Sequence, residues 1–251
     1  MTLEIPPINL EHYEALLSAN FSVQWTAKAS PKDWAKSVNS SKNLEAAKIA
    51  DAVVCQLPQD KLTRASLREF ISTTHNAEAR YLAIMAWGGM KPFHGADSLK
   101  SRTLWIPIVE ALSKSTQSRA KDFETLIQHR PGNASSELLS GIGVAYFTKL
   151  MFFLRPRADA YILDQWTAKS VNLLFSVANQ KAPIVKLYGD TVNDRNTSRD
   201  YEVFCKCVEK LATKLKTSPA DTEERIFSNG GGKGKDGAWR AYVKSKWSRS
   251  Q

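Results

Sequence analysis

Apolar residues recur along most of this chain at the spacing of amphipathic helices, and no segment alternates convincingly with period two. No Asn-Gly or Asp-Gly dipeptide stands between β-branched runs, so the sequence indicates no hairpin. The pattern therefore predicts an all-α fold. The predicted helices cover residues 9–19, 42–55, 63–72, 78–87, 101–114, 118–129, 135–139, 144–154, 165–177, 198–216, a segment starting at 218, and 238–247.

Residues with strong terminal preferences mark several of these helix ends. Thr63 and Asn76 stand where N-caps are expected, and Ser218 followed by proline is typical of a helix start. Gly88-Gly89 predicts a helix stop. Pro107 is expected to kink or split the helix over 101–114, because proline lacks the amide proton that a helix interior needs.

The helix predicted over 144–154 is almost wholly apolar and has one charged side chain, Lys149, in its middle. Burying a charged ammonium group costs several kcal/mol of free energy unless the group is paired or neutralised. Buried lysines are therefore often kept for chemistry or for a specific anion. The alternative is a lysine whose flexible side chain reaches the surface.

A tight turn, Gly141-Ile142-Gly143, precedes this helix. Two glycines let the backbone turn sharply and approach another surface closely, and the helix N-terminus behind them presents amide groups that can hold a phosphate. Ile142 is expected to pack between the two helices that the turn joins. An ordinary helix–helix turn explains the spacing equally well.

Asp164 stands just before the helix predicted over 165–177, in the N-cap position. The free amides and the dipole of a helix N-terminus favour an ionised carboxylate there. If the helices on either side of residues 155–163 fold back on each other, Asp164 and Lys149 can face one cleft. Aspartate is also a common structural N-cap, so a purely structural role remains the alternative.

The charge balance indicates a polyanionic partner. The formal net charge is +10, spread along the chain, and nucleic acid is the usual partner of such a basic surface. The chain has three cysteines, no secretory leader and no apolar run near the roughly 20 residues that a membrane span needs. We therefore expect a cytoplasmic protein, most simply a monomer, that makes no membrane contact.

No cofactor or metal is expected. The lysine-containing glycine loop at 230–236 lacks P-loop spacing, the histidines are isolated, and no dinucleotide or iron–sulfur motif is present. Seven tryptophans are available to stack on an extruded base, although most are expected in the core. Trp166, two residues after Asp164, is the expected exception.

The Gly-Ile-Gly turn, the segment Phe147-Thr148-Lys149, and Ile162-Leu163-Asp164 before a helix resemble the helix-hairpin-helix DNA glycosylases. The chain looks most like the bacterial and archaeal branch with the 8-oxoguanine-glycosylase fold, and the segment 86–89 is similar too. The resemblance implies one glycosylase-like domain over 1–251, made of two helical lobes with an active-site cleft between them. The motif would occupy about 135–155 and the catalytic-aspartate helix about 164–178.

The resemblance also implies residue roles. Gly141, Ile142 and Gly143 would grip a phosphate of double-stranded DNA, and Lys149 and Asp164 would be catalytic. The lysine lies six residues past Gly143, unlike in the eukaryotic enzymes, where it follows the hairpin directly. Asp164 is therefore the firmer match, and a hydrolase without a lyase step is the alternative to a bifunctional enzyme.

Members of this branch resemble anti-phage enzymes that remove a heavily modified base from viral DNA. The resemblance thus suggests excision of α-glucosylated hydroxymethylcytosine from phage DNA, which would leave abasic sites. Such a base would need a large pocket with polar side chains, and the candidates are Gln165, Trp166 and Tyr161, with Asn172 and Asp159 nearby. The alternatives are 8-oxoguanine repair, a non-catalytic DNA-binding protein, and a helical scaffold whose basic face binds RNA.

Overall fold

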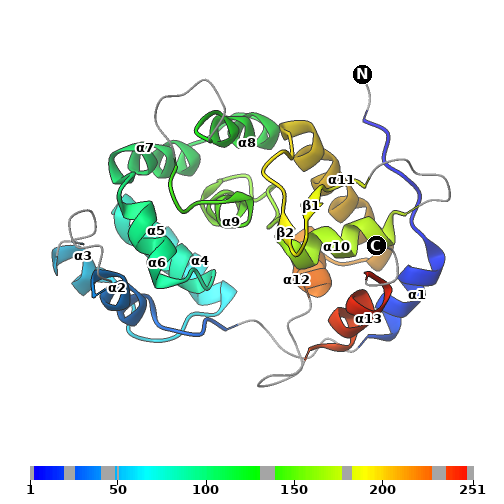
Figure 1. Ribbon diagram of the computed structural model, residues 1–251, viewed down its shortest axis with the longest axis horizontal. Helices are drawn as coiled ribbons and strands as arrows, with labels where there is room; N and C mark the ends of the chain where they lie inside the picture. Colours follow the sequence, from blue (N-terminus) through cyan, green and yellow to red (C-terminus); the bar gives the residue numbers. More distant parts are fainter. Residues whose placement is uncertain are drawn as a thin grey trace. The chain divides into compact units, whose positions relative to one another are not determined.

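The protein is described by a computed structural model that covers residues 3–19, 26–40, 49, 51–130, 139–176, 183–227 and 236–247 (Figure 1). The chain divides into two compact units. One comprises Trp25–Ala160 and is called the α9 unit here, after its central helix. The other joins Met1–Gln24 to Tyr161–Gln251 and is called the α10 unit.

The α9 unit is built around one buried helix. Its elements are α2 (Pro31–Asn39), α3 (Asp51–Gln56), α4 (Arg64–Thr73), α5 (Ala77–Trp87), α6 (Pro92–Leu99), α7 (Arg102–Ser113), α8 (Arg119–Gln128) and α9 (Val144–Leu154). Helix α9 packs against α4, α5, α7 and α8, which lie around it in Figure 1. Nine of its 11 residues are buried, because its apolar side chains cover nearly the whole circumference.

The α10 unit is also built around one helix. Its elements are α1 (Leu10–Ser18), α10 (Gln165–Leu174), β1 (Leu187–Tyr188), β2 (Thr191–Val192), α11 (Ser198–Leu215), α12 (Pro219–Phe227) and α13 (Ala238–Trp247). Helix α10 contacts α1, α11, α12, α13 and β2. The Ser170 hydroxyl ties three of these together, since it donates to Ile226 O at 2.8 Å and accepts from Trp239 Nε1 at 2.9 Å.

The all-α prediction is confirmed, and several helix ends lie where the sequence placed them. Thr63 caps α4 in a capping box with Ser66, and Asn76 caps α5 through bonds from Glu78 N and Ala79 N. The lysine helix spans residues 144–154 as predicted. No helix in the described part of the chain is long and apolar enough to cross a bilayer.

The structure corrects three expectations. Helices α2 and α6 were not predicted, and each begins with a proline at its first turn. Helix α6 contains Gly95, which lowers helix propensity, but a Cβ there would lie 2.8 Å from Trp34 of α2, so close packing favours glycine. Helix α7 continues through Pro107, so of the two predicted effects the kink stays a prediction.

The third correction is a hairpin, which the sequence did not indicate. Strands β1 and β2 pair antiparallel with Leu187 opposite Val192 and Tyr188 opposite Thr191. They are two residues each, too short for a period-two signal, and Gly189 at φ +55° makes the turn in place of the expected Asn-Gly or Asp-Gly. Two predicted helices lie partly outside the described residues: of residues 42–50 only Ile49 is described, and none of residues 135–138 is. Trp25 also lies outside the described residues.

Candidate active site

The glycine turn leads directly into α9. Gly143 is the N-cap residue, and its carbonyl accepts from Tyr146 N and Phe147 N, each at 3.1 Å. Because glycine has no side chain, it cannot accept hydrogen bonds from the first amides of the helix as a serine or aspartate cap would. A Cβ added to Gly143 would meet no atom of the described residues within 4 Å, so the turn is open on this side. The helix predicted over 135–139 lies almost wholly outside the described residues.

Gly141 is required for two separate reasons. Its φ is +71°, a conformation that side chains other than glycine rarely adopt. A Cβ at this position would also lie 2.5 Å from His94 O and 3.0 Å from Ser98 N on α6. Ile142 is 7% exposed and lies in the core, while its predicted packing between two helices stays a prediction because most of the first helix lies outside the described residues. The turn is therefore fixed by contact with α6, a helix distant in the sequence.

Lys149 is buried in the middle of α9, with 8% of its surface exposed. Its Nζ donates to Ala145 O at 3.3 Å and lies 5.1 Å from the centre of the Tyr146 ring. The aliphatic part of the side chain packs against Gly88, where an added Cβ would lie 2.7 Å from Lys149 Cδ. The side chain of Lys149 therefore does not reach the surface, and the missing side chain of Gly88 makes room for it.

Asp164 is the N-cap of α10, as predicted. Its Oδ1 accepts from Trp166 N at 2.8 Å and from Thr167 N at 3.0 Å, while Asp164 N donates to Thr167 Oγ1 at 3.0 Å. No hydrogen bond from the described residues reaches Oδ2. The carboxylate is 9% exposed. One oxygen thus fixes the carboxylate on its own helix, and the other remains for another group.

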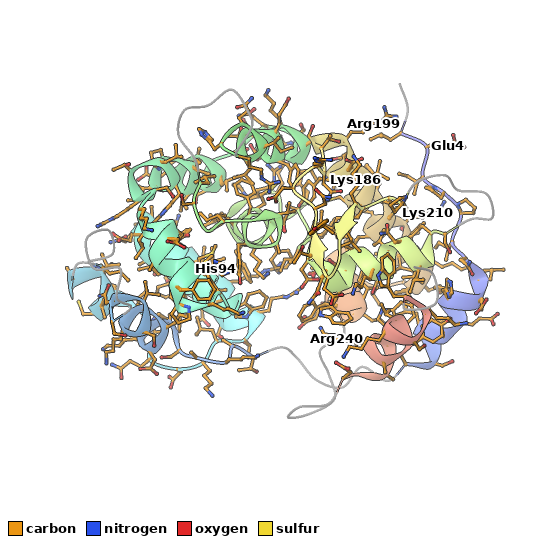
Figure 2. All side chains as sticks on the ribbon, in the orientation of Figure 1. Glu4, His94, Lys186, Arg199, Lys210 and Arg240 are labelled. Carbon is orange, nitrogen blue, oxygen red and sulfur yellow. The ribbon has the colours of Figure 1, made fainter. Side chains whose placement is uncertain are left out.

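The surroundings of Asp164 are aromatic and basic. Arg240, which extends from α13 (Figure 2), lies with its guanidinium carbon 4.5 Å from the Trp166 ring centre and donates to Phe227 O at 2.7 Å. Burial lowers the pKa of Arg240, and the nearby Asp164 carboxylate acts in the opposite direction. Trp166 is partly exposed, whereas Trp34, Trp87, Trp105 and Trp239 are buried in the core. Trp247 is partly exposed as well, and the role of Trp166 in base stacking stays a prediction.

The other two predicted pocket residues have structural partners. With the Gln165 amide oriented so that its nitrogen faces Asp190 O, its oxygen accepts from Trp166 Nε1 at 3.2 Å. Tyr161 is 4% exposed; its amide donates to Tyr201 Oη at 3.2 Å, and its hydroxyl donates to Glu209 at 3.4 Å. Gln165 therefore lies beside Trp166, and Tyr161 belongs to the core of the α10 unit. Their roles in base binding stay predictions.

The two additional candidates are also engaged within the fold. Asn172 donates to Val185 O at 2.8 Å and accepts from Val185 N at 2.9 Å. Asp159 accepts from Arg155 Nε at 2.8 Å. Lys149 and Asp164 belong to different units, so their convergence on one cleft stays a prediction.

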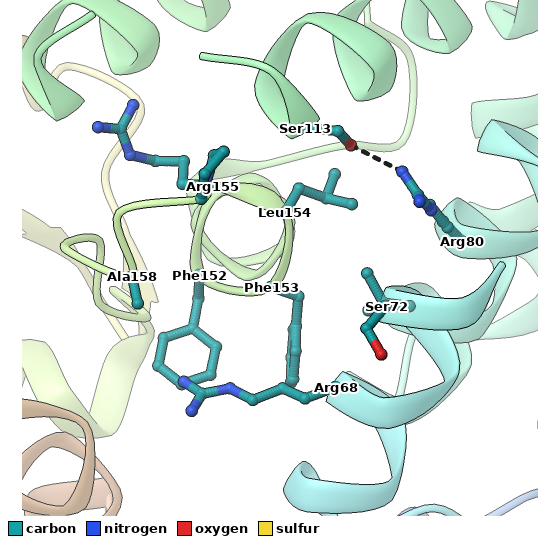
Figure 3. A pocket seen from close by; sticks show the side chains of 11 residues that line it. Arg68, Ser72, Arg80, Ser113, Phe152, Phe153, Leu154, Arg155 and Ala158 are labelled. Atoms are coloured by element: carbon teal, nitrogen blue, oxygen red, sulfur yellow. Dashed lines mark hydrogen bonds between the residues drawn. The ribbon is translucent and has the colours of Figure 1, made fainter. Parts of the chain in front are cut away.

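A pocket that the sequence did not indicate lies in the α9 unit (Figure 3). We call it the Arg68 pocket; it has a volume of about 350 Å³ and is lined by Arg68, Ile71, Ser72, Arg80, Ser113, Phe152, Phe153, Leu154, Arg155, Pro156 and Ala158. The Arg68 guanidinium carbon lies 4.5 Å from the Phe152 ring centre, and Arg80 Nη1 donates to Ser113 Oγ at 3.2 Å. Phe152 and Phe153 follow Lys149 by three and four residues, which places all three on one face of α9.

Within the described residues, no group of three or more histidine, cysteine, aspartate or glutamate side chains is placed to hold a metal ion. The functional side chains near Asp164 and Lys149 are a carboxylate, an amine, guanidinium groups and aromatic rings. These groups can stabilise a cation, attack a carbon atom as a nucleophile, bind phosphates and stack on bases.

A helical fold with a glycine turn, a buried lysine and a helix-capping aspartate is the arrangement expected of a DNA-base-excising enzyme. Residues 22–227 match the model of the family described as "Putative 8-oxoguanine DNA glycosylase OGG-like protein". This match covers most of the chain, and the chain belongs to this family. Its description points to DNA glycosylase activity and to DNA as the partner. No curated protein and no solved structure matches the chain.

Sequence reasoning missed three features of the site. Gly88 was interpreted as a helix stop and as part of the family-like segment 86–89, but not as the residue that accommodates Lys149. Arg240 packs on the Trp166 ring although the two residues are 74 positions apart, so no local sequence pattern indicates this contact. The ion pair of Lys169 with Asp190 depends on the unpredicted hairpin. Basic and aromatic residues in the last helix were the one visible signal for Arg240.

Proposed function

We propose that the protein is a DNA N-glycosylase that extrudes a modified base and breaks its N-glycosidic bond, with Asp164 as the essential carboxylate. The observation that carries the proposal is the geometry of Asp164 in a chain of this family. Oδ1 is held by two backbone amides of α10, which leaves Oδ2 to act on a substrate. A carboxylate fixed in this way is organised before the substrate arrives, which is what electrostatic catalysis needs.

In the proposed reaction, the bonding electrons of the N-glycosidic bond leave with the base, and the deoxyribose becomes an oxocarbenium-like cation. The negative charge of Asp164 stabilises this cation, as carboxylates do in glycosidases. Water then adds to C1′ and gives up a proton, for which Asp164 is the acceptor. The departing base takes up a proton from solvent and Asp164 returns its proton to solvent, so the products are the neutral free base and an abasic site. Extrusion of the base costs a few kcal/mol, offset by stacking and phosphate contacts.

Lys149 supplies a second route in the proposal. A neutral amine can attack C1′ as the base leaves, and ring opening then gives a Schiff base from which the DNA strand is cleaved by elimination. Lys149 is buried in the middle of the otherwise apolar helix α9. Gly141, Ile142 and Gly143 hold a backbone phosphate in this proposal, supported by the open side of Gly143 at the start of α9.

For the substrate we propose α-glucosylated hydroxymethylcytosine of phage DNA, which would make the enzyme antiviral. The Arg68 pocket supports this choice. Its lining combines three arginines and two serines with two phenylalanine rings, groups that suit a sugar with several hydroxyls, and it begins one turn from Lys149 on the same face of α9. The family description favours 8-oxoguanine as the second candidate.

The test is a base-release assay on three DNA duplexes that carry glucosylated hydroxymethylcytosine, 8-oxoguanine or uracil, with alkali to cleave abasic sites. We expect release from the first duplex by the wild type. Asp164→Asn should reduce the rate at least about a hundredfold, the size of a lost transition-state contact, and retain DNA binding. Asp221→Asn, which changes a carboxylate in the first turn of α12, is the matched control. Normal excision by Asp164→Asn would refute the assignment.

A further inference from the structure

An asymmetric ion pair lies on α10, five residues after Asp164. Lys169 Nζ is 2.5 Å from Asp190 Oδ1, yet the lysine side chain is 6% exposed and the aspartate side chain 82% exposed. The hydrogen bond to Lys169 lowers the pKa of Asp190. A buried ammonium ion needs an anion, whereas an exposed carboxylate is well hydrated without a cation. The pair therefore serves the lysine more than the aspartate.

Arg155, a buried cation in the α9 unit that also has aspartate partners, is held quite differently. Arg155 is 0% exposed; it forms ion pairs with Asp122, 7% exposed, and Asp159, 33% exposed, and donates to Gln117 O at 3.1 Å. These partners come from α8, its preceding loop and the segment after α9, so the arginine fastens structural elements together. Asp190 instead stands at the tip of an exposed hairpin.

The hairpin is anchored at its base. The Asn172 side chain binds both the amide and the carbonyl of Val185, and the Asn196 side chain does the same for Lys186 at 2.9 and 2.8 Å. At the tip, Asp190 contacts α10 through Lys169 and Gln165. The tip can therefore leave α10 without breaking the bonds that hold the base.

The surface around Lys169 has the composition of a nucleic-acid contact. Lys169 Nζ lies 5.1 Å from the Trp166 ring centre, and Lys244 Nζ lies 5.5 Å from the same ring, on which Arg240 also packs. The acidic groups that face these cations are Asp190, Asp236, which pairs with Lys244 at 2.5 Å, and Asp164. Cations beside an aromatic ring are the usual means of gripping a DNA strand.

We propose that Lys169 is a binding site for a backbone phosphate of DNA, and that the Asp190 carboxylate occupies this site in the free protein. A phosphate diester carries the same single negative charge and likewise presents two charged acceptor oxygens, so it can replace Asp190 without leaving the buried ammonium ion unpaired. The hairpin tip then moves into solvent. The inference rests on the proposed function only in that DNA is the ligand. Beyond that function, it assigns a phosphate contact to Lys169 in the α10 unit.

The experiment measures equilibrium binding of the full chain to a labelled DNA duplex by fluorescence anisotropy over a series of salt concentrations. Lys169→Met should weaken binding about tenfold, equally on modified and unmodified DNA, and should lower the salt slope by about 0.9, the value for one phosphate contact. Asp190→Asn should strengthen binding about threefold to tenfold, because the internal competitor is removed. The double variant should bind like Lys169→Met.

Glu11→Gln is the matched control for the change in net charge. Glu11 also pairs with a lysine in the α10 unit, Lys246, but that lysine is 33% exposed, so removal of Glu11 should change affinity little. Thermal melting identifies any variant that fails to fold. If a single variant does not fold, the double variant, which has no buried charge at this position, is compared with the wild type in its place. Weaker or unchanged binding by folded Asp190→Asn, or an unchanged salt slope for Lys169→Met, would overturn the inference while base release by the wild type still stands. Absence of any DNA binding by the wild type would overturn both proposals.

Discussion

Helices α9 and α10 are each the centre of one unit, and each carries one residue of the proposed chemistry, but the two residues are held differently. Asp164 is fixed by amides two and three residues further along its own helix. Lys149 is positioned by packing against Gly88, which belongs to the end of α5. A carboxylate held by its own helix keeps its orientation wherever that helix forms. An amine held by distant packing depends on the whole unit.

The largest expected effect separates the two residues chemically. Lys149→Met keeps an unbranched side chain of similar length in the buried position, so the α9 unit should fold. Borohydride trapping of a covalent protein–DNA adduct should then be lost completely, while base release that depends on Asp164 continues. The wild type is the positive control. An adduct of undiminished yield in Lys149→Met would show that another amine forms the Schiff base.

The next effect tests how far the turn before α9 depends on α6. Gly141→Ala combines a positive φ with a Cβ 2.5 Å from His94 O, so we expect a loss of more than about 2 kcal/mol of stability. Gly143→Ala is the matched control, since its φ is −88° and its added Cβ has open space. Thermal unfolding compares them. Equal melting temperatures would mean that the turn can shift away from α6.

The difference between local and distant contacts also explains which features could be predicted from sequence. The bounds of α9, the caps at Thr63 and Asn76, and the N-cap position of Asp164 all follow from residues within one helical turn. Such signals are visible in the chain itself. The all-α class follows from the same periodicity.

The features that could not be predicted join distant residues. Helix α6 contains a glycine that favours other conformations, and its packing against Trp34 of α2 overrides that preference. The strands of the β1–β2 hairpin are too short to give an alternation signal. The tip of the hairpin is held by the ion pair between Asp190 and Lys169, which are 21 positions apart. The Arg68 pocket joins α4, α5, α7 and the end of α9, which no single window of sequence contains.

Gly88→Ala is expected to have an intermediate effect, confined to the lysine. The φ of Gly88 is −67°, which alanine adopts readily, and the added Cβ would lie 3.2 Å from Ile84 O, so the backbone should shift only slightly. The new Cβ would overlap Lys149 Cδ, and this flexible side chain must move. We expect the yield of trapped adduct to fall about tenfold, as for misplaced reacting groups, with a change in stability below about 1 kcal/mol.

Base release by the Asp164 route is the internal reference for this variant. If Gly88→Ala lowers adduct formation and base release by the same factor, the two activities are not positioned independently. The comparison of a locally held carboxylate with a distantly held amine would then fail. A matched substitution at Gly89 is unsuitable, because its φ of +70° introduces strain of its own.

The smallest effect concerns the local support of Asp164. Thr167 Oγ1 donates to Ile162 O at 2.8 Å and accepts from Asp164 N at 3.0 Å, and Thr167 is fully buried. Thr167→Val keeps the shape but leaves these two groups without their partner, which should cost about 1–2 kcal/mol in the free energy of unfolding. Base release should fall only several-fold, because Trp166 N and Thr167 N still hold Oδ1.

Thr167→Ser restores the hydroxyl and should recover most of the lost activity. Chemical denaturation and the base-release assay measure the two effects, and a loss of base release as large as that of Asp164→Asn would show that the hydroxyl, rather than the backbone amides, fixes the carboxylate.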